Sequence, residues 1–259
     1  MRFSHALTCG LLLSLAACAP LQPYVLSGDM EDSQQRWNAF LTLRGQEGPS
    51  LAEGSLRFGE SGNTHRVTWL LWGNDAEQLR FDIQAGMGNT LAKARLTDGE
   101  LLLYLPGDNR ALRGPDTPDG ILRRIGLDLP LSLHELYAVI QGNFSAALSS
   151  ARILSSRNLE NGNIELKLGT DSPHMPQIIL ELDGRNLPVR WQIPRAWDIR
   201  IRCGEDALPR RIDGTRQTGP NEEEYRLILL IKTRQVKEGF PEKDLELTLP
   251  ANVQFVSGI

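Results

Sequence analysis

The sequence is poor in the residues on which catalytic and metal-binding sites usually depend. It has three cysteines and four histidines, and His5, His65, His134 and His174 show no metal-ligand spacing with one another or with a cysteine. The nucleophile motif Gly-x-Ser-x-Gly is missing, and residues 86–88, Gly-Met-Gly, lack the third glycine of a dinucleotide-binding loop. We therefore expect no metal, no cofactor and no catalytic residue, and we expect that the protein is not an enzyme.

Dense positive charge is also missing. The formal net charge is -4, the isoelectric point is about 5.7, and no run of lysine and arginine stands out. Nucleic-acid-binding proteins usually carry a basic patch, so we expect no nucleic-acid partner, and an anionic membrane surface would not attract the chain electrostatically. With 259 residues, 41% of them hydrophobic, the chain is large enough for one sizeable core or two domains.

The cysteines do not indicate a disulfide framework. Cys9 lies within an N-terminal apolar run, and Cys203 follows Trp197, Ile199 and Ile201 at a spacing of two residues. This period places Cys203 on the buried face of a strand. We interpret it as a small hydrophobic side chain rather than a reactive thiol.

Residues 1–18 have the three parts of a secretion signal. Arg2 supplies a positive charge, residues 6–15 are apolar, and two small alanines precede Cys18. The apolar run is shorter than the roughly 20 residues that span a bilayer. An ordinary signal peptide with an incidental cysteine is an alternative that this pattern leaves open.

The tetrapeptide Leu15-Ala16-Ala17-Cys18 resembles the lipobox of bacterial lipoproteins. The resemblance implies cleavage before Cys18 and attachment of lipid to it, and such acyl chains anchor a protein because each buried CH2 contributes about 0.8 kcal/mol. We expect a lipoprotein signal peptide over residues 1–17, a lipidated N-terminus and tether over 18–28, and one folded domain over 29–259. Alanine, not aspartate, follows the cysteine, which resembles the pattern of enterobacterial lipoproteins sorted to the outer membrane.

Alternating apolar and polar residues predict a chain made mainly of β-strands. Before a helical insert, we expect strands over residues 39–44, 53–59, 66–72, 78–84, 90–96 and 100–105. After the insert, we expect strands over 151–160, 162–168, 176–183, 187–193, 197–203, 224–233 and 245–249, with hairpin turns at residues 161–162 and 184–186. Residues 29–37 are expected to form a short helix, and residues 204–221 a polar, mobile loop.

The insert carries explicit helix-start signals. Asp116 and Pro118 favour the start of one helix, and Ser132 with Glu135 fits a capping box, in which each side chain satisfies a free backbone N–H. Gly142 is a plausible stop for this second helix. We expect helices over residues 118–126 and 132–141.

So many half-apolar strands must bury one face, and curling the sheet on itself is one solution. The two short helices cannot cover such a sheet from outside, but they can close its open side as a lid. The residues indicate about eleven to thirteen strands in a half-open antiparallel barrel with this lid inserted mid-chain. Whether the interior is a cavity or is filled by its own side chains stays open at this point.

The residues above resemble the LolB family, the outer-membrane receptors for lipoproteins, and more distantly the periplasmic carrier LolA. The resemblance is carried by the lipobox at Cys18, the strand–turn–strand segment from Leu79 to Thr90, and the segment from Leu129 to Gly142 with its proline-containing helix entry. The order of strands, helical insert and further strands is also similar. The resemblance covers residues 36–202 and implies an open, unclosed β-barrel of about 11 strands, whose cavity takes the acyl chains of a client lipoprotein.

The resemblance also assigns a role to one turn. In the family, a protruding loop with an exposed leucine is linked to delivery of clients into the bilayer, and Met87 occupies the matching position between Gly86 and Gly88. Glycine stands here for the family's proline, and methionine for its leucine. A turn residue that folds back onto the sheet is the alternative interpretation of Met87.

The expected function follows from this resemblance. We expect an outer-membrane lipoprotein on the periplasmic face that binds acyl chains of lipoproteins, or another lipid, and assists their insertion. Its partners would be acylated clients and a periplasmic LolA-like carrier, and we expect a monomer. A non-transporting envelope lipoprotein that acts as a scaffold or protein-binding module is the alternative. The candidate ligand-binding residues are Leu79, Phe81, Ile83, Leu101, Leu103, Trp191 and Trp197.

Overall fold

The structure is a computed structural model, and it describes residues 30–43, 45, 48–60, 62–148, 150–171, 175–216 and 224–256. The expected signal peptide, the lipobox with Cys18 and the tether therefore lie outside the described residues. His5, His174 and residues 217–221 of the expected loop also lie outside them.

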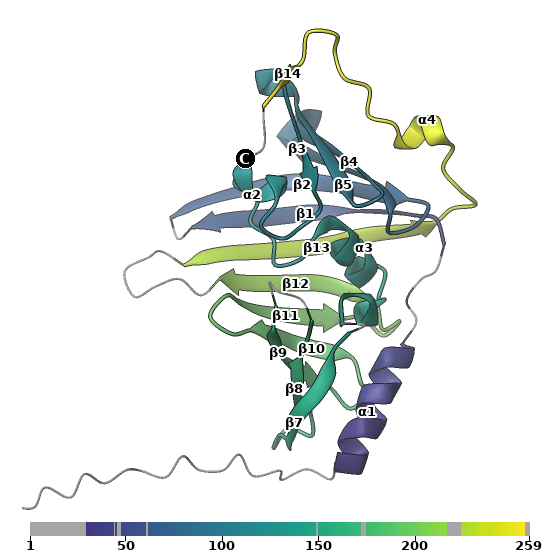
Figure 1. Ribbon diagram of the computed structural model, residues 1–259, viewed down its shortest axis with the longest axis vertical. Coiled ribbons are helices and arrows are strands. Elements are labelled where there is room, and N and C mark those ends of the chain that lie inside the picture. Colours follow the sequence, from purple (N-terminus) through teal and green to yellow (C-terminus); the bar gives the residue numbers. More distant parts are fainter. Residues whose placement is uncertain are drawn as a thin grey trace, which may run out of the picture.

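One sheet of fourteen strands carries the fold, in the order β14-β6-β5-β4-β3-β2-β1-β13-β12-β11-β10-β9-β8-β7 (Figure 1). The strands are β1 (Ser50–Glu60), β2 (Asn63–Gly73), β3 (Gln78–Ala85), β4 (Asn89–Thr97), β5 (Glu100–Leu105), β6 (Arg110–Pro115), β7 (Arg152–Asn158), β8 (Ile164–Gly169), β9 (Gln177–Leu182), β10 (Pro188–Ile193), β11 (Trp197–Cys203), β12 (Pro209–Arg216), β13 (Tyr225–Val236) and β14 (Gln254–Phe255). Neighbouring strands are antiparallel except β14 and β6, which are parallel. β6 and β7 lie far apart in this order, so the sheet does not close, and the expected mainly β, open antiparallel fold is confirmed with more strands than expected.

Helical segments supplement the sheet. They are α1 (Met30–Thr42), α2 (Ile121–Arg124), α3 (Leu133–Ile140), α4 (Glu242–Leu245) and the 3₁₀ turns η1 (Gly86–Gly88), η2 (Pro106–Asp108) and η3 (Phe144–Leu148). α1 packs against β7 through a 2.6 Å hydrogen bond from Ser33 Oγ to Ser156 Oγ. Trp37 and Phe40 of this helix are buried in the core.

The sheet consists of two meanders joined at one seam. β1 to β6 follow one another across one half, β7 to β13 across the other, and β13 pairs with β1. The connection from β6 to β7 must therefore cross the sheet, and it carries α2 and α3 over the central strands (Figure 1) and η3 beside α1. The segment between β6 and β7, called the crossover below, therefore packs on the inner face of the sheet.

Alternation decides which side chains meet the crossover. In β11, Trp197, Ile199 and Ile201 are buried, whereas Asp198 and Arg200 point to the outer face. A strand turns successive side chains to opposite faces, so a period of two separates an apolar inner surface from a polar outer one. β8, β9 and the first part of β13 follow the same alternation and also supply buried residues to the core.

The C-terminal segment runs along the outside of the first meander. Trp72 Nε1 donates to Asp244 O at 3.1 Å, and Arg80 lies over the Trp72 ring and donates to Glu246 O. The segment ends as β14, which pairs with the edge strand β6.

Three expectations about local structure are wrong. Residues 39–44 were expected as a strand, but residues up to Thr42 belong to α1, because Trp37 and Phe40, three residues apart, stack at 5.2 Å on one helix face. Residues 245–249 were expected as a strand, yet α4 ends at Leu245 and the following residues do not join the sheet.

The third correction concerns the expected loop over residues 204–221, which contains β12. Its sequence is mostly polar, and only Ile212 and Pro209 are apolar residues buried on its inner side. Pairing between β11 and β13 holds it extended, and such pairing has no local sequence signal. By contrast, the turns expected at residues 161–162 and 184–186 do join hairpins, with positive φ at Gly162 and Asn186.

Cys203 closes β11 in a half-buried position and forms no disulfide. Burial, assisted by the negative charge of Asp183, raises the pKa of its thiol to about 11. The thiol is therefore protonated at neutral pH, which agrees with its interpretation as a packing residue.

Candidate functional site

The candidate ligand-binding residues all lie on the inner side of the sheet. Their relative exposures range from 0% for Leu79 to 6% for Trp197. Trp191 and Trp197 border cavities. The other five are packed within the hydrophobic core; they are Leu79, Phe81, Ile83, Leu101 and Leu103. Their inward direction agrees with the alternation in the sequence, and their role in ligand binding stays a prediction.

An enclosed gap of about 20 Å³ lies between α3 and strands β10 to β13. All its lining residues are apolar; they are Leu129, Pro130, Leu131, Leu136, Val139, Trp191, Ile199, Ile201, Ile212, Leu227 and Leu229. A space of this size holds about one water molecule. The space between α3 and these strands is therefore filled almost completely by the side chains that line it.

Two open grooves lie at the rim, one on each side of Ile125, the residue that follows α2. One has a volume of about 470 Å³ and the other about 550 Å³, and Leu91 and Ile125 line both. Apolar residues of β5, β6 and the C-terminal segment complete the first groove; they are Leu105, Leu112 and Val256. Phe58, Val67 and Tyr225 contribute to the second. Charged residues such as Asp108, Arg110 and Arg66 also line the grooves, so these large openings beside α2 have mixed polar and apolar walls, unlike the small gap beneath α3.

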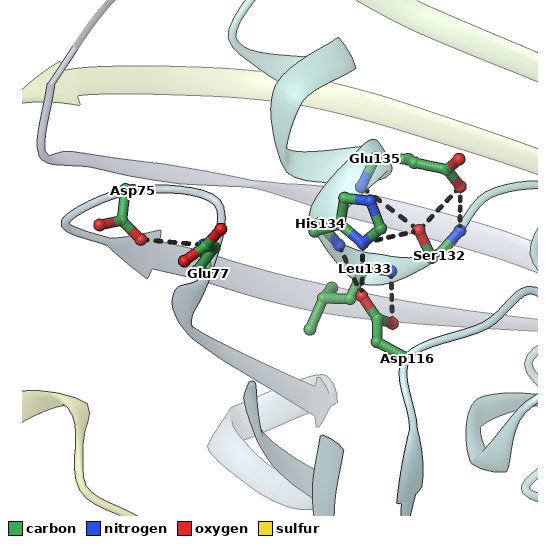
Figure 2. Close-up of polar contacts among 7 residues, drawn as sticks. All are labelled: Asp75, Glu77, Asp116, Ser132, Leu133, His134 and Glu135. Carbon is green, nitrogen blue, oxygen red and sulfur yellow. Dashed lines mark hydrogen bonds and ion pairs between the residues drawn. The ribbon is translucent and has the colours of Figure 1, made fainter. Parts of the chain in front are cut away.

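The start of α3 is fastened to the end of β6 by a buried carboxylate (Figure 2). Asp116 accepts hydrogen bonds from the backbone N–H of Leu133 at 2.8 Å and of His134 at 2.9 Å. The expected capping box is confirmed, because Ser132 Oγ accepts from the Glu135 N–H and Glu135 Oε2 accepts from the Ser132 N–H. Asp116 therefore caps α3 across the connection, instead of starting α2 as its position beside Pro118 suggested.

His134 completes this cluster. Its Nδ1 lies 3.0 Å from Asp116 Oδ2, and its side chain is half exposed. The hydrogen bond to Asp116 raises the pKa of His134, and the negative charges of Asp116, Glu135 and Glu77 act in the same direction against the opposing effect of burial. Figure 2 shows Glu77 and Asp75 in the β2–β3 turn facing this end of α3.

The end of α3 is fastened to β1 and β13. Ser50 Oγ lies 2.7 Å from Tyr137 Oη and accepts from Gln141 Nε2 at 2.7 Å, and all three side chains are buried. Arg234 Nε donates to Ile140 O at 2.8 Å. Burial lowers the pKa of Arg234 to about 10, so the guanidinium is still charged at neutral pH.

The segment between α2 and α3 is fastened to β12 and β13. Tyr225 Oη donates to Gly126 O at 3.1 Å and accepts from the Asp128 N–H at 3.2 Å. Arg216 Nη1 lies 2.5 Å from Asp128 Oδ2. Burial raises the pKa of Asp128, opposed by the charge of Arg216. The crossover is thus held by directional polar contacts at three places.

The part of the chain that the structure describes contains neither a metal-binding cluster nor a membrane-spanning helix. Its residues include no group of three or more His, Cys, Asp or Glu that could hold a metal ion. Among the same residues, no helix combines the length and the apolar character needed to cross a bilayer.

Comparisons with known proteins bear on the architecture. No family model matches the sequence, and no curated protein matches it. A LolA superfamily protein from Nitrosomonas europaea superimposes with a TM-score of 0.57 at 10% identity, over 83% of this chain and 97% of that one. A domain from Vibrio parahaemolyticus that is named a putative outer membrane lipoprotein-sorting protein domain gives a TM-score of 0.54 at 12% identity, over 83% of this chain and 95% of that one. The fold is of the LolA/LolB type. A DUF1329 family protein from Desulfovibrio piger shares it, with a TM-score of 0.54 at 11% identity, over 84% of this chain and 96% of that one.

Within this LolA/LolB-type fold, Met87 lies in η1, the turn between β3 and β4. Gly86 and Gly88 are exposed, and Gly88 has a φ of +83°, a conformation that favours glycine. The side chain of Met87 lies outside the described residues, so its role at a membrane stays a prediction. The lipid-attachment role of Cys18 also stays a prediction.

Sequence reasoning missed the residues that fasten the crossover. Arg234 lies in the polar end of β13, residues 232–235, whereas Tyr137 places a hydroxyl on the otherwise apolar stripe of α3. A polar residue at such a position indicates a buried partner. That signal was available, but it names no partner, because Ser50 and Arg234 are far from α3 in the sequence.

Proposed function

We propose that this protein binds the acyl chains of lipoproteins, or of another lipid, between the inner face of its sheet and α3. The observation that carries this proposal is the wholly apolar gap beneath a crossover helix, within a LolA/LolB-type fold. One similar structure is named as a lipoprotein-sorting domain, and that name supports the class of ligand.

The gap is too small for an acyl chain, so binding requires α3 to move. Leu136 and Val139 contact the gap from α3, and an acyl chain would replace them against the same inner surface. Each CH2 group that leaves water contributes about 0.8 kcal/mol, whereas each hydrogen bond holding the helix contributes about 0.5–1.5 kcal/mol. A chain of ten methylenes therefore contributes about 8 kcal/mol toward displacing the helix, opposed by these hydrogen bonds and by the apolar area that Leu136 and Val139 would expose.

The rim grooves on each side of Ile125 are the proposed entrance. They place apolar surface next to solvent, and Leu91, which borders both, is 42% exposed. An acyl chain entering there would meet α2 before α3. No nucleotide is required, because the chain moves from water to apolar surface.

The cellular setting is part of the same proposal. Lipid attached to Cys18 would anchor the domain to the outer membrane on its periplasmic side, with residues 18–28 as the tether. A periplasmic LolA-like carrier would deliver clients to it. The protein would act without catalysis and as a monomer.

A second candidate function is favoured by one observation, the small volume of the gap beneath α3, about 20 Å³. A non-transporting envelope lipoprotein that serves as a scaffold or protein-binding module needs no internal space. In that case the crossover stays closed, and the outer surface or the rim carries the function.

Site-specific photo-crosslinking in cells separates the two functions. A photoreactive amino acid is placed in the full-length protein at Leu136, which lines the gap, or at Arg200 on the outer face as a control. Lipid transfer predicts that position 136 captures acylated proteins or lipid and position 200 does not. Capture of neither species at position 136, in a protein that reaches the envelope, would exclude lipid transfer and leave the scaffold.

A further inference from the structure

The C-terminal segment is held to the sheet firmly at its start and weakly at its end. At the start, Asn74 of the β2–β3 turn donates to Phe240 O at 3.0 Å and accepts from the Phe240 N–H at 2.8 Å. Trp72 Nε1 donates to Asp244 O, and Leu245 is buried. The first half of the segment is therefore fixed by directional contacts and by one buried side chain.

The end of the segment, β14, has fewer contacts. Both of its residues are exposed, and so is Val256, which follows it. Gln254 N–H donates to Asn109 O at 3.0 Å and Val256 N–H donates to Ala111 O at 2.9 Å, while the exposed Asn109 Nδ2 donates to Asn252 O at 3.0 Å. No side chain of β14 is buried, so this strand can leave the edge without opening the core.

β14 covers only part of the edge with which it pairs. β6 extends from Arg110 to Pro115, and β14 is in register with Arg110 and Ala111 alone. No other strand in the described part of the chain lies on that side of β6. An edge strand presents unpaired N–H and C=O groups, and an extended peptide can bind such an edge as an added strand. The kind of partner that fits here is therefore an extended polypeptide.

The same edge borders the proposed entrance for acyl chains. Arg110 and Leu112 of β6 line the groove of about 470 Å³ beside α2, and Val256 lines it from the end of β14. A client lipoprotein carries its lipid on its N-terminal cysteine, as the lipobox implies for Cys18 of this chain. A client that places its acyl chains in this groove therefore has its first residues beside β6.

We propose that the polypeptide that follows the lipidated cysteine of a client adds to the edge of β6 as a strand and displaces β14. The inference rests on the proposed function and deepens it by naming a second part of the client that is recognised. Because the acyl chain and the polypeptide are joined, binding of the first raises the local concentration of the second at the edge. Main-chain hydrogen bonds do not require particular side chains, so one edge can accept clients of different sequence.

The test compares two lipopeptides that differ only in their backbone. One is an N-octanoyl pentapeptide of alternating serine and threonine with a C-terminal fluorophore, and the other is methylated on every backbone nitrogen, which removes the donors of a strand. Each is titrated into the full-length lipidated protein in nanodiscs and followed by fluorescence anisotropy, with empty nanodiscs as the blank. Wild type should bind the unmodified peptide at least about threefold more tightly, the effect of one hydrogen bond.

A matched pair of variants acts on β14 and leaves β6 intact. Gln254→Pro with Val256→Pro removes the two N–H groups that hold this end of the chain, whereas Gln254→Ala with Val256→Ala shortens the same side chains and keeps both N–H groups. The proline variant should bind the unmodified peptide about fivefold more tightly than the alanine variant, since no strand has to be displaced. The methylated peptide should bind both variants alike.

Three results would count against the proposals in different ways. Equal binding of the two peptides by wild type, or of the unmodified peptide by the two variants, would overturn the inference and leave acyl binding standing. A peptide without the octanoyl group that binds as tightly as the lipopeptide would assign the edge to an unacylated partner, and would overturn the inference as well. If no octanoylated peptide bound to any of the three proteins, the proposed function would fail, and the inference with it.

Discussion

The two helices of the crossover are held to the sheet in different ways. α3 is capped by Asp116 and by its own capping box, and its end is hydrogen-bonded to Ser50 and Arg234. α2 has four residues and no side-chain cap. It packs through Ile121 and Leu122, and the open grooves lie beside it.

This difference indicates an order of opening. A lipid can replace apolar contacts with contacts of the same kind, but it cannot replace directional hydrogen bonds. The α2 side, which is packed through only two buried apolar residues and lies beside open grooves, should therefore open first. α3 should then move as a unit, once the free energy gained by burying the acyl chain exceeds that of the hydrogen bonds that hold this helix.

The largest expected effect comes from Ser50→Ala. This change leaves the buried Gln141 Nε2 without its partner and the buried Tyr137 hydroxyl with only a 3.5 Å hydrogen bond to Gly73 O, and an unsatisfied buried group costs about 1–3 kcal/mol. We expect the free energy of unfolding, measured in urea, to fall by about 3 kcal/mol. Hydrogen exchange should accelerate in α3 more than in α2.

Ser55→Ala is the control for this variant, because Ser55 is buried on the same strand and no hydrogen bond from its side chain to the crossover is present among the described residues. If hydrogen exchange accelerated equally in α2 and α3 of Ser50→Ala, the two helices would not be held to the sheet in different ways.

The next effect is that of Asp116→Ala. It removes the acceptor for two backbone N–H groups at the start of α3, and loss of a cap costs about 0.5–2 kcal/mol. We expect about 2 kcal/mol of destabilisation, since the carboxylate is also buried. Asp119→Ala removes an exposed ion pair with Arg123 and should cost less than about 0.5 kcal/mol. Similar losses of unfolding free energy for both variants would show that the hydrogen bonds of Asp116 to α3 contribute no more than an exposed ion pair.

A smaller change in stability is expected at the rim. Ile125→Ala removes a half-buried side chain between the two grooves, at a cost of about 1 kcal/mol in the free energy of unfolding. Removing this barrier should nevertheless raise the association rate of an acyl probe measured by stopped flow. An unchanged rate would indicate that entry does not pass α2.

The smallest effect concerns pH. The pKa of His134 is raised in the folded state, so its contact with Asp116 stabilises the fold fully below the ordinary histidine pKa of about 6.5. This contribution is lost as pH rises through the higher folded-state value. The difference in unfolding free energy between wild type and His134→Gln should be below about 1 kcal/mol at pH 6, because the side chain is half exposed, and should shrink toward pH 8.

That pH dependence also has an internal check. In the Asp116→Ala background, the His134→Gln change should have the same effect at both pH values, since the partner that raises the histidine pKa is gone. A dependence that survives there would point to Glu135 or Glu77 as the main partner.

Local signals in the sequence predicted local structure well. The alternation of β11, the turn at Gly162 and the capping box of Ser132 and Glu135 are all confirmed. Each of these depends on residues within a few positions of one another. The sequence order of strands, insert and strands also sufficed for the fold class.

Features that depend on distant partners were not predictable in the same way. β12 is extended because it pairs with β11 and β13, although its own residues are polar. Asp116 lies beside one helix in the sequence and caps another. The gap beneath α3 is nearly filled because Leu136 and Val139 pack against β10 to β13, and volume left between such surfaces cannot be read from periodicity.

The seam between β1 and β13 has a consequence for biogenesis. Ser50 of β1 pairs with Val236 of β13, so nearly the whole domain must be synthesised before this ladder can form. Contacts between such remote segments slow folding, and until β13 arrives β1 presents an unpaired edge that invites aggregation. A chaperone that binds the nascent chain would therefore need to cover the edge of β1 until β13 has been synthesised.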